Sequence, residues 1–287
     1  MKSTSTKTKK YQKEFFNQKA SLYPWPHLLI KAGFGKTYKP REVKFKEYLD
    51  LLGMKPKDKV LDVGCGKGIF LARTRKTYKV KGVGVDFSSK SIARAKKWSK
   101  TNLVFQVADA TKLPFDDQTF DYVLSFDTLE HIQDQEKALS EMVRVLKGKG
   151  KLLIYTLNKN QSFTWHFWLK KIGVPIGKRA AHDPDLFLDP EETKKKLKDL
   201  GIKIKRLELF NSLFTLAADE AIMLTVLIFK HLNFFNPASR FKTNLGKAFL
   251  NTTDFFSHLL LPLLQILETP WRKAGYSNSF FVLGEKR

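Results

Sequence analysis

From Lys59 onward, short apolar segments alternate with helical segments, and this alternation restricts the fold more than any other feature of the sequence. Five strands are expected in the segments KVLDVG (59–64), YKVKGVGVD (78–86), LVFQVAD (103–109), FDYVLSFD (120–127) and KGKLLIYTL (149–157). Helices are expected between them, near residues 67–77, 89–99 and 135–147. Strict alternation of strand and helix is typical of a parallel sheet with right-handed crossovers.

Helix-boundary signals and two later strands complete the pattern. One helix should begin after Asp134, a favourable N-cap, and stop at Gly148; another should begin at Pro190, with Asp189 as N-cap, and end at Gly201. The segments KIKRLELF and SFFVLGEK would add the last strands. The predicted fold class is α/β, a Rossmann-like, doubly wound, mostly parallel seven-stranded sheet with helical insertions before strand 6 and between strands 6 and 7.

Composition divides the chain into three regions. Residues 1–42 form a basic N-terminal tail and arm, 43–210 with 276–287 form the predicted α/β domain, and 211–275 form an apolar helical insertion. The insertion carries the runs AIMLTVLIF and FFSHLLLPLLQIL, which are shorter than the roughly 18–20 uncharged residues of a membrane-spanning helix. We therefore expect a cap over the site or a membrane-contact element, and no transmembrane helix.

Charge and cysteine content bear on partners and compartment. The 287-residue chain has a formal net charge of +24, which favours contact with nucleic acid or anionic lipid. A general preference for lysine codons explains the excess equally well. The single cysteine, Cys65, allows no intramolecular disulfide, and the N-terminal residues do not resemble a secretory signal. A cytoplasmic protein is expected, with peripheral contact at the inner membrane face as a further option.

The segment KVLDVGCGKG places three glycines where the first strand turns into the first helix. Gly64, Gly66 and Gly68 would let a ligand approach the backbone and its amide donors at the helix N-terminus. In open parallel sheets, ligands bind at the carboxyl ends of the strands. A dinucleotide site would carry G-x-G-x-x-G, but Ile69 occupies the third glycine position of that pattern.

Acidic residues at three successive strand ends define the ligand further. Asp86 is placed to accept hydrogen bonds from two ribose hydroxyls, whereas Asp62 would repel a pyrophosphate but suit a cationic amino-acid group. The ligand should therefore carry a ribose and a cationic tail without a diphosphate. S-adenosylmethionine has that shape, and Asp109 could then accept a hydrogen bond from its adenine amino group.

Four segments in order, VLDVGCGKG, GVDFS, VADATKLPF and FDYVLSFDTLEHI, resemble the motifs of class I S-adenosylmethionine-dependent methyltransferases. The resemblance is to methyltransferase type 11 and quinone-biosynthesis members, and it covers residues 43–210 plus the last strand. It implies that the methionine part of the cofactor lies against Asp62, Gly64, Cys65 and Gly66, and that Gly68 completes the turn. The ribose would then contact Asp86 and Phe87, and the adenine would contact Asp109 and Ala110. The sulfonium would lie above Ser125.

Candidate catalytic residues follow the fourth strand in DTLEHI. An acceptor hydroxyl or acidic carbon must lose a proton, and Glu130 and His131 are the candidate groups. The segment resembles one in ubiquinone-biosynthesis O-methyltransferases that is associated with a divalent metal, which would here be held by Asp127, Glu130 and His131. The favoured interpretation is a segment that completes the cofactor pocket without metal. His182 resembles a lid histidine of the same enzymes, although a surface histidine fits that position equally well.

These features predict an S-adenosylmethionine-dependent methyltransferase that methylates oxygen or carbon of a small, hydrophobic or lipid-like molecule. The segment FTWHFWLKKIG mixes Trp, Phe and Lys as interfacial helices do, which favours contact with an anionic membrane. An RNA methyltransferase that uses the basic surface is the first alternative, although no RNA-binding module is evident. The second is a catalytically silent cofactor-fold binding subunit. No protein partner follows from the sequence.

Overall fold

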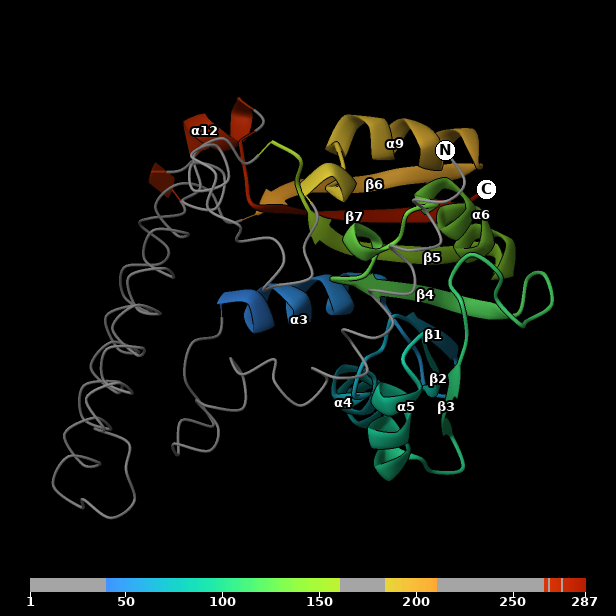
Figure 1. Cartoon of the computed structure of the whole chain (residues 1–287). Coiled ribbons are helices and arrows are strands. Elements are labelled where there is room, and N and C mark those ends of the chain that lie inside the picture. Colours follow the sequence, from blue (N-terminus) through green and yellow to red (C-terminus); the bar gives the residue numbers. More distant parts are fainter. Residues whose placement is uncertain (1–39, 161–183, 211–265, 268, 275) are drawn as a thin grey trace, which may run out of the picture. The chain divides into compact units, whose positions relative to one another are not determined.

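The computed structural model describes residues 40–160, 184–210, 266–267, 269–274 and 276–287 (Figure 1). The described residues belong to two units. Of the described residues, 48–160, 184–210 and 278–287 belong to the sheet unit, and 40–47, 266–267, 269–274 and 276–277 belong to the second unit. Four predicted features lie outside the described residues in whole or nearly so: the basic tail and arm, His182, the segment FTWHFWLKKIG and the apolar insertion.

Seven strands form one sheet in the order β3-β2-β1-β4-β5-β7-β6. The strands are β1 (Lys59–Val63), β2 (Lys81–Asp86), β3 (Leu103–Val107), β4 (Phe120–Phe126), β5 (Leu146–Leu157), β6 (Ile202–Phe210) and β7 (Ser279–Lys286). Neighbouring strands from β3 to β5 are parallel, and β7 is antiparallel to both β5 and β6. The predicted doubly wound, mostly parallel sheet is confirmed.

The helices of the sheet unit are divided between the two faces of the sheet. The crossover helices are α4 (Ile69–Tyr78), α5 (Ser89–Ala95), α6 (Gln135–Val145) and α9 (Pro190–Asp199). From β1 the chain adds β2 and β3 toward one edge of the sheet, and from β4 it adds the remaining strands toward the other edge. Because the crossovers are right-handed, α4 and α5 cover one face and α6 and α9 cover the opposite face (Figure 1). The reversal point between β1 and β4 is where such sheets bind ligands.

Two further helices lie outside this crossover set. Helix α3 (Pro40–Leu52) contains residues of both units and is followed by Gly53 at φ +68°. Helix α12 (Thr269–Lys273) belongs to the second unit. Among the described residues, no helix is long and apolar enough to cross a bilayer.

Most predicted helix boundaries are confirmed, and one is wrong. The Asp134 side chain accepts the N–H of Lys137, and the Asp189 side chain accepts two amides at the start of α9. Helix α6, however, ends at Val145 instead of Gly148. Leu146 is fully buried and already pairs with Phe120, and the chain then bulges out of the ladder before β4–β5 pairing resumes. Burial of Leu146 in the sheet thus ends the helix before the glycine is reached.

Candidate functional site

The turn after β1 has the left-handed backbone expected of its glycines. The φ angles are +80° at Gly64, +53° at Gly66 and +72° at Gly68. The N–H groups of Gly64 and Cys65 both donate to the carbonyl of Val85 on β2, at 2.8 and 2.9 Å. These two bonds fix the turn against the neighbouring strand at the carboxyl edge of the sheet.

Two of these glycines are required by close packing, and the third faces open space. A Cβ atom on Gly64 would lie 2.0 Å from Oγ1 of Thr128, in the loop after β4, and one on Gly68 would lie 2.6 Å from the ring of Phe105. A Cβ atom on Gly66 would meet nothing within 4 Å. The backbone at Gly66 is therefore open to a ligand, whereas Gly64 and Gly68 bring neighbouring elements together.

Asp86, the last residue of β2, is tied to the turn by its carboxylate. One oxygen accepts the N–H of Gly66 at 2.9 Å, and the other accepts the N–H of Ser88 at 2.8 Å. Burial raises the pKa of Asp86, and the two amide bonds oppose that rise. An ionised carboxylate has about four acceptor positions, so Asp86 can serve two further donors, such as the hydroxyls of a ribose.

Asp62 lies on β1 just before the turn and is only 3% exposed. Its burial, followed by the charge of Asp86, raises the pKa of Asp62 to about 7. Burial and the same two acids also raise the pKa of Cys65, which keeps the thiol protonated and unsuited to nucleophilic attack. A buried carboxylate beside a second one is a site for a cationic group, because a cation would compensate both charges.

Replacing Asp62 by asparagine is expected to stabilise the ligand-free protein at pH 8 but not at pH 4. The folded-state pKa of about 7 lies above the ordinary value of 3.8, so folding stability is lost as pH rises through this window. Asparagine does not ionise, and the variant should gain about 2–4 kcal/mol relative to wild type between pH 4 and pH 8. Urea unfolding at both pH values measures this difference.

The exposed Asp116, replaced by asparagine in the same way, is the control and should show no such pH-dependent gain. A wild-type protein that loses no stability relative to Asp62→Asn between pH 4 and pH 8 would contradict the raised pKa.

Asp109 lies in the connection between β3 and β4. One of its carboxylate oxygens accepts both the N–H and the hydroxyl of Thr111, at 2.9 and 2.8 Å. Thr111 is 6% exposed, and Ala110 packs against the core. The orientation of Asp109 is therefore set by its hydrogen bonds to the buried Thr111.

Ser125, near the end of β4, is fully buried between Val63 of β1 and Ile154 of β5. Its hydroxyl oxygen has no hydrogen-bond partner within the described part of the chain. Buried polar groups in native proteins are usually paired, so this hydroxyl at the ligand-binding edge is a candidate contact for a ligand.

The loop after β4 places Glu130 and His131 in different environments. Both lie in a short 3-10 helix, η2 (Leu129–His131). Glu130 is fully buried and accepts the hydroxyl of Thr156 on β5 at 2.9 Å, whereas His131 is half-buried. Glu130 therefore anchors the loop to the sheet.

The described structure does not group the weak metal candidates Asp127, Glu130 and His131 as metal ligands. Across the described ranges, no three His, Cys, Asp or Glu side chains are grouped as metal ligands would be. Glu130 is fully buried, and one of its carboxylate oxygens accepts the hydroxyl of Thr156. The second predicted base, His182, lies outside the described residues.

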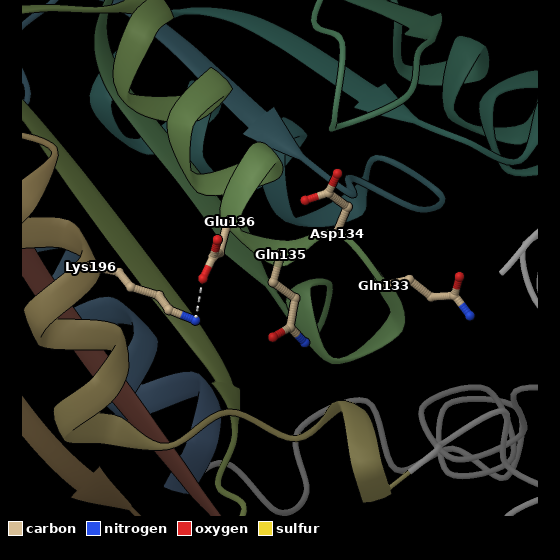
Figure 2. Close-up of a pocket in the computed structure, with 5 residues that line it drawn as sticks. All are labelled: Gln133, Asp134, Gln135, Glu136 and Lys196. Carbon is tan, nitrogen blue, oxygen red and sulfur yellow. Dashed lines mark ion pairs between the residues drawn. The ribbon is translucent and has the colours of Figure 1, made fainter. Parts of the chain in front are cut away.

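Gln135, the first residue of α6, was not singled out by the sequence and links two parts of the site. Its side-chain amide donates to the carbonyl of Leu129 in η2, at 3.0 Å, and to that of Leu186, at 2.6 Å, in η3 (Pro184–Leu186). It lies in an open depression lined by Gln133, Asp134, Gln135, Glu136 and Lys196 (Figure 2). A glutamine at a helix start carries no sequence signal for such a bridge.

Comparisons with known proteins identify relatives of this chain. A family model described as a methyltransferase domain matches residues 61–154. Demethylmenaquinone methyltransferase of Beutenbergia cavernae is 31% identical over 182 residues, which are 62% of this chain and 72% of that protein. Phosphoethanolamine N-methyltransferase 3 of Arabidopsis thaliana is 41% identical over 137 residues, 46% of this chain but only 28% of that protein. The chain thus spans about a quarter of the length of the first curated relatives that it matches.

A solved structure shares the fold. Phosphoethanolamine N-methyltransferase 2 of Haemonchus contortus, in complex with S-adenosyl-L-methionine, superposes with a TM-score of 0.63 at 20% identity. The superposition covers 96% of this chain and 60% of that one.

Proposed function

Because the chain belongs to the class I S-adenosylmethionine-dependent methyltransferases, we propose that it transfers a methyl group from S-adenosylmethionine to a small, lipid-like acceptor. The observation that carries the proposal is the arrangement of acids at the carboxyl edge of the sheet. Asp62 and Asp86 flank a glycine turn that is open at Gly66, and Asp109 follows the next strand. This set suits a ribose and a cationic tail, and it opposes a pyrophosphate.

The bound cofactor would supply a methyl group on a positively charged sulfur, which is already activated for displacement. The acceptor atom forms a bond to that methyl carbon while the carbon–sulfur bond breaks, and the sulfur keeps the electron pair. In this proposal Asp86 accepts from the ribose hydroxyls, Asp62 pairs with the ammonium group and Asp109 accepts from the adenine amino group. Cys65, Phe87, Ala110 and Ser125 complete the pocket. Positioning of the two reactants then provides much of the rate enhancement.

His131 is the proposed base for an acceptor that must lose a proton. It is half-buried in the loop after β4, so it is partly exposed to solvent. Glu130 is proposed to position this loop through Thr156 instead of taking the proton itself. His182 stays a prediction for a second base or acceptor-orienting residue.

One relative supports an acceptor from quinone metabolism, because the relative matched over most of its length is named for demethylmenaquinone. The relative with the highest identity reported above is named for phosphoethanolamine, a polar amine, and supports N-methylation instead. We favour O- or C-methylation of a hydrophobic molecule, because the sequence of residues 211–275 carries long apolar runs whose composition suits such an acceptor. RNA is the second candidate, and the net charge of +24 is the observation in its favour.

Methyl-labelled S-adenosylmethionine incubated with the protein and a cell extract tests the acceptor class. Label in the organic phase is the expected result, whereas label in precipitated RNA would favour the alternative. Label in a water-soluble phosphorylated amine would contradict a hydrophobic acceptor. No transfer, despite cofactor binding, would favour a catalytically silent subunit. The Asp86→Asn protein serves as the control for label carried by other enzymes in the extract.

A further inference from the structure

Arg144, in the last turn of α6, binds the connection between β3 and β4. Its guanidinium donates to the carbonyls of Leu113 at 3.1 Å and Phe115 at 2.8 Å, and to the carboxylate of Asp117 at 2.7 Å. It also donates to both carboxylate oxygens of Glu141, one turn earlier, at 2.7 and 2.9 Å. This is a fork-to-fork pair with three further contacts, a geometry that lysine cannot reproduce.

Glu141, the acidic partner of Arg144, also binds the β3–β4 connection. Its carboxylate accepts the N–H of Leu113 at 2.7 Å, so Arg144 and Glu141 together hold both backbone polar groups of Leu113. The hydrogen bond from Arg144 lowers the pKa of Glu141, which keeps the pair ionised. The Arg144 and Glu141 side chains are 30% and 18% exposed, so solvent weakens this pair less than it weakens a fully exposed one.

The held segment leads directly to Asp109. Leu113 is 4% exposed, and two residues before it Thr111 donates its N–H and hydroxyl to the Asp109 carboxylate. Residues 108–119 contain no helix or strand that could hold Asp109 in place. Apart from the bond from the Ala108 N–H to the carbonyl of Asp86 and the turn from Asp109 to Lys112, this part of the site is kept in position by its contacts with α6.

We propose that Arg144 and Glu141 are positioning residues that hold the β3–β4 connection so that Asp109 can recognise the amino group of adenine. This inference rests on the proposed function, because it assumes that the cofactor's adenine lies against Asp109. Neither side chain touches the cofactor in this account. Their effect should appear as discrimination between purine bases.

The test compares S-adenosylhomocysteine with S-inosylhomocysteine, in which an oxo group replaces the adenine amino group. Calorimetric titration of the wild type should show roughly tenfold tighter binding of S-adenosylhomocysteine, the value of one hydrogen bond to a charged group. In Arg144→Lys this preference should fall to about twofold or less, since lysine cannot hold Leu113 and Phe115 together. Glu141→Gln should fall between the two, because glutamine can still accept the Leu113 N–H.

Lys196→Met is the matched control. Lys196 forms an ion pair of 2.9 Å with Glu136 at the other end of α6 (Figure 2). This ion pair does not involve the β3–β4 connection. Its purine preference should equal that of the wild type. An unchanged preference in both Arg144→Lys and Glu141→Gln would overturn the inference, as would equal weakening of both ligands, which indicates a general loss of stability.

A wild type that binds both ligands equally would also overturn it, because Asp109 would not then read the amino group. Failure of the proposed cofactor assignment is distinguishable, since the wild type would then bind neither ligand, whereas a loss of methyl transfer alone would leave both binding measurements intact.

Discussion

Asp86→Asn is expected to weaken the binding of S-adenosylhomocysteine by about a hundredfold or more. The carboxylate of Asp86 already accepts the amides of Gly66 and Ser88, and in our account it also accepts two ribose hydroxyls. Asparagine has one acceptor oxygen, and its NH2 group would face donors. Each hydrogen bond to a charged group is worth about 1.5–3 kcal/mol, so the loss of two corresponds to at least a hundredfold.

Calorimetric titration measures this loss, and thermal unfolding shows whether the variant is folded. The matched control is Asp116→Asn, an exposed acid in the β3–β4 connection that should bind as the wild type does. A folded Asp86→Asn protein with wild-type affinity would remove Asp86 from the ribose site.

Gly64→Ala is expected to lower the free energy of unfolding by about 3 kcal/mol. The φ of +80° costs an L residue about 1–2 kcal/mol. The added Cβ would also lie 2.0 Å from Oγ1 and 2.4 Å from Cγ2 of Thr128, and relieving such contacts costs about 1–3 kcal/mol more. Urea unfolding measures the total.

Gly66→Ala is the control for the backbone contribution alone. Its φ of +53° is also left-handed, but the new Cβ would meet nothing within 4 Å, so a loss of about 1 kcal/mol is expected. Thr128→Gly removes the atoms that Gly64→Ala would strike. A double-mutant cycle should therefore show a favourable coupling of about 1 kcal/mol or more. Equal losses for Gly64→Ala and Gly66→Ala would contradict the close contact with Thr128.

Local sequence signals predicted those parts of the fold that depend on neighbouring residues. Alternation of strands and helices gave the sheet class, and Asp134 and Asp189 marked helix starts by side-chain caps. The predicted end of α6 at Gly148 is wrong, because Leu146 is buried and paired in the sheet, and this ends the helix before the glycine that would otherwise stop it. Tertiary pairing of this kind is not visible in a local pattern.

The candidate site likewise contains residues that the sequence predicts and residues that it does not. The glycine turn and the acids at the strand ends are predicted by motif order and spacing. The residues that hold them in place are not predicted by any motif. Thr128, Gln135 and Arg144 act through contacts with residues far away in the sequence, such as Gly64, Leu186 and Leu113. The spacing of Glu141 and Arg144 predicts an ion pair on α6, but not that the pair holds another segment.

The most direct test of the central claim is calorimetric titration of the wild type with S-adenosylhomocysteine and, separately, with NAD+. We predict binding of one S-adenosylhomocysteine per chain and no measurable binding of NAD+, because Ile69 replaces the third glycine of a dinucleotide turn and Asp62 opposes a pyrophosphate. Binding of NAD+ without binding of S-adenosylhomocysteine would contradict the account.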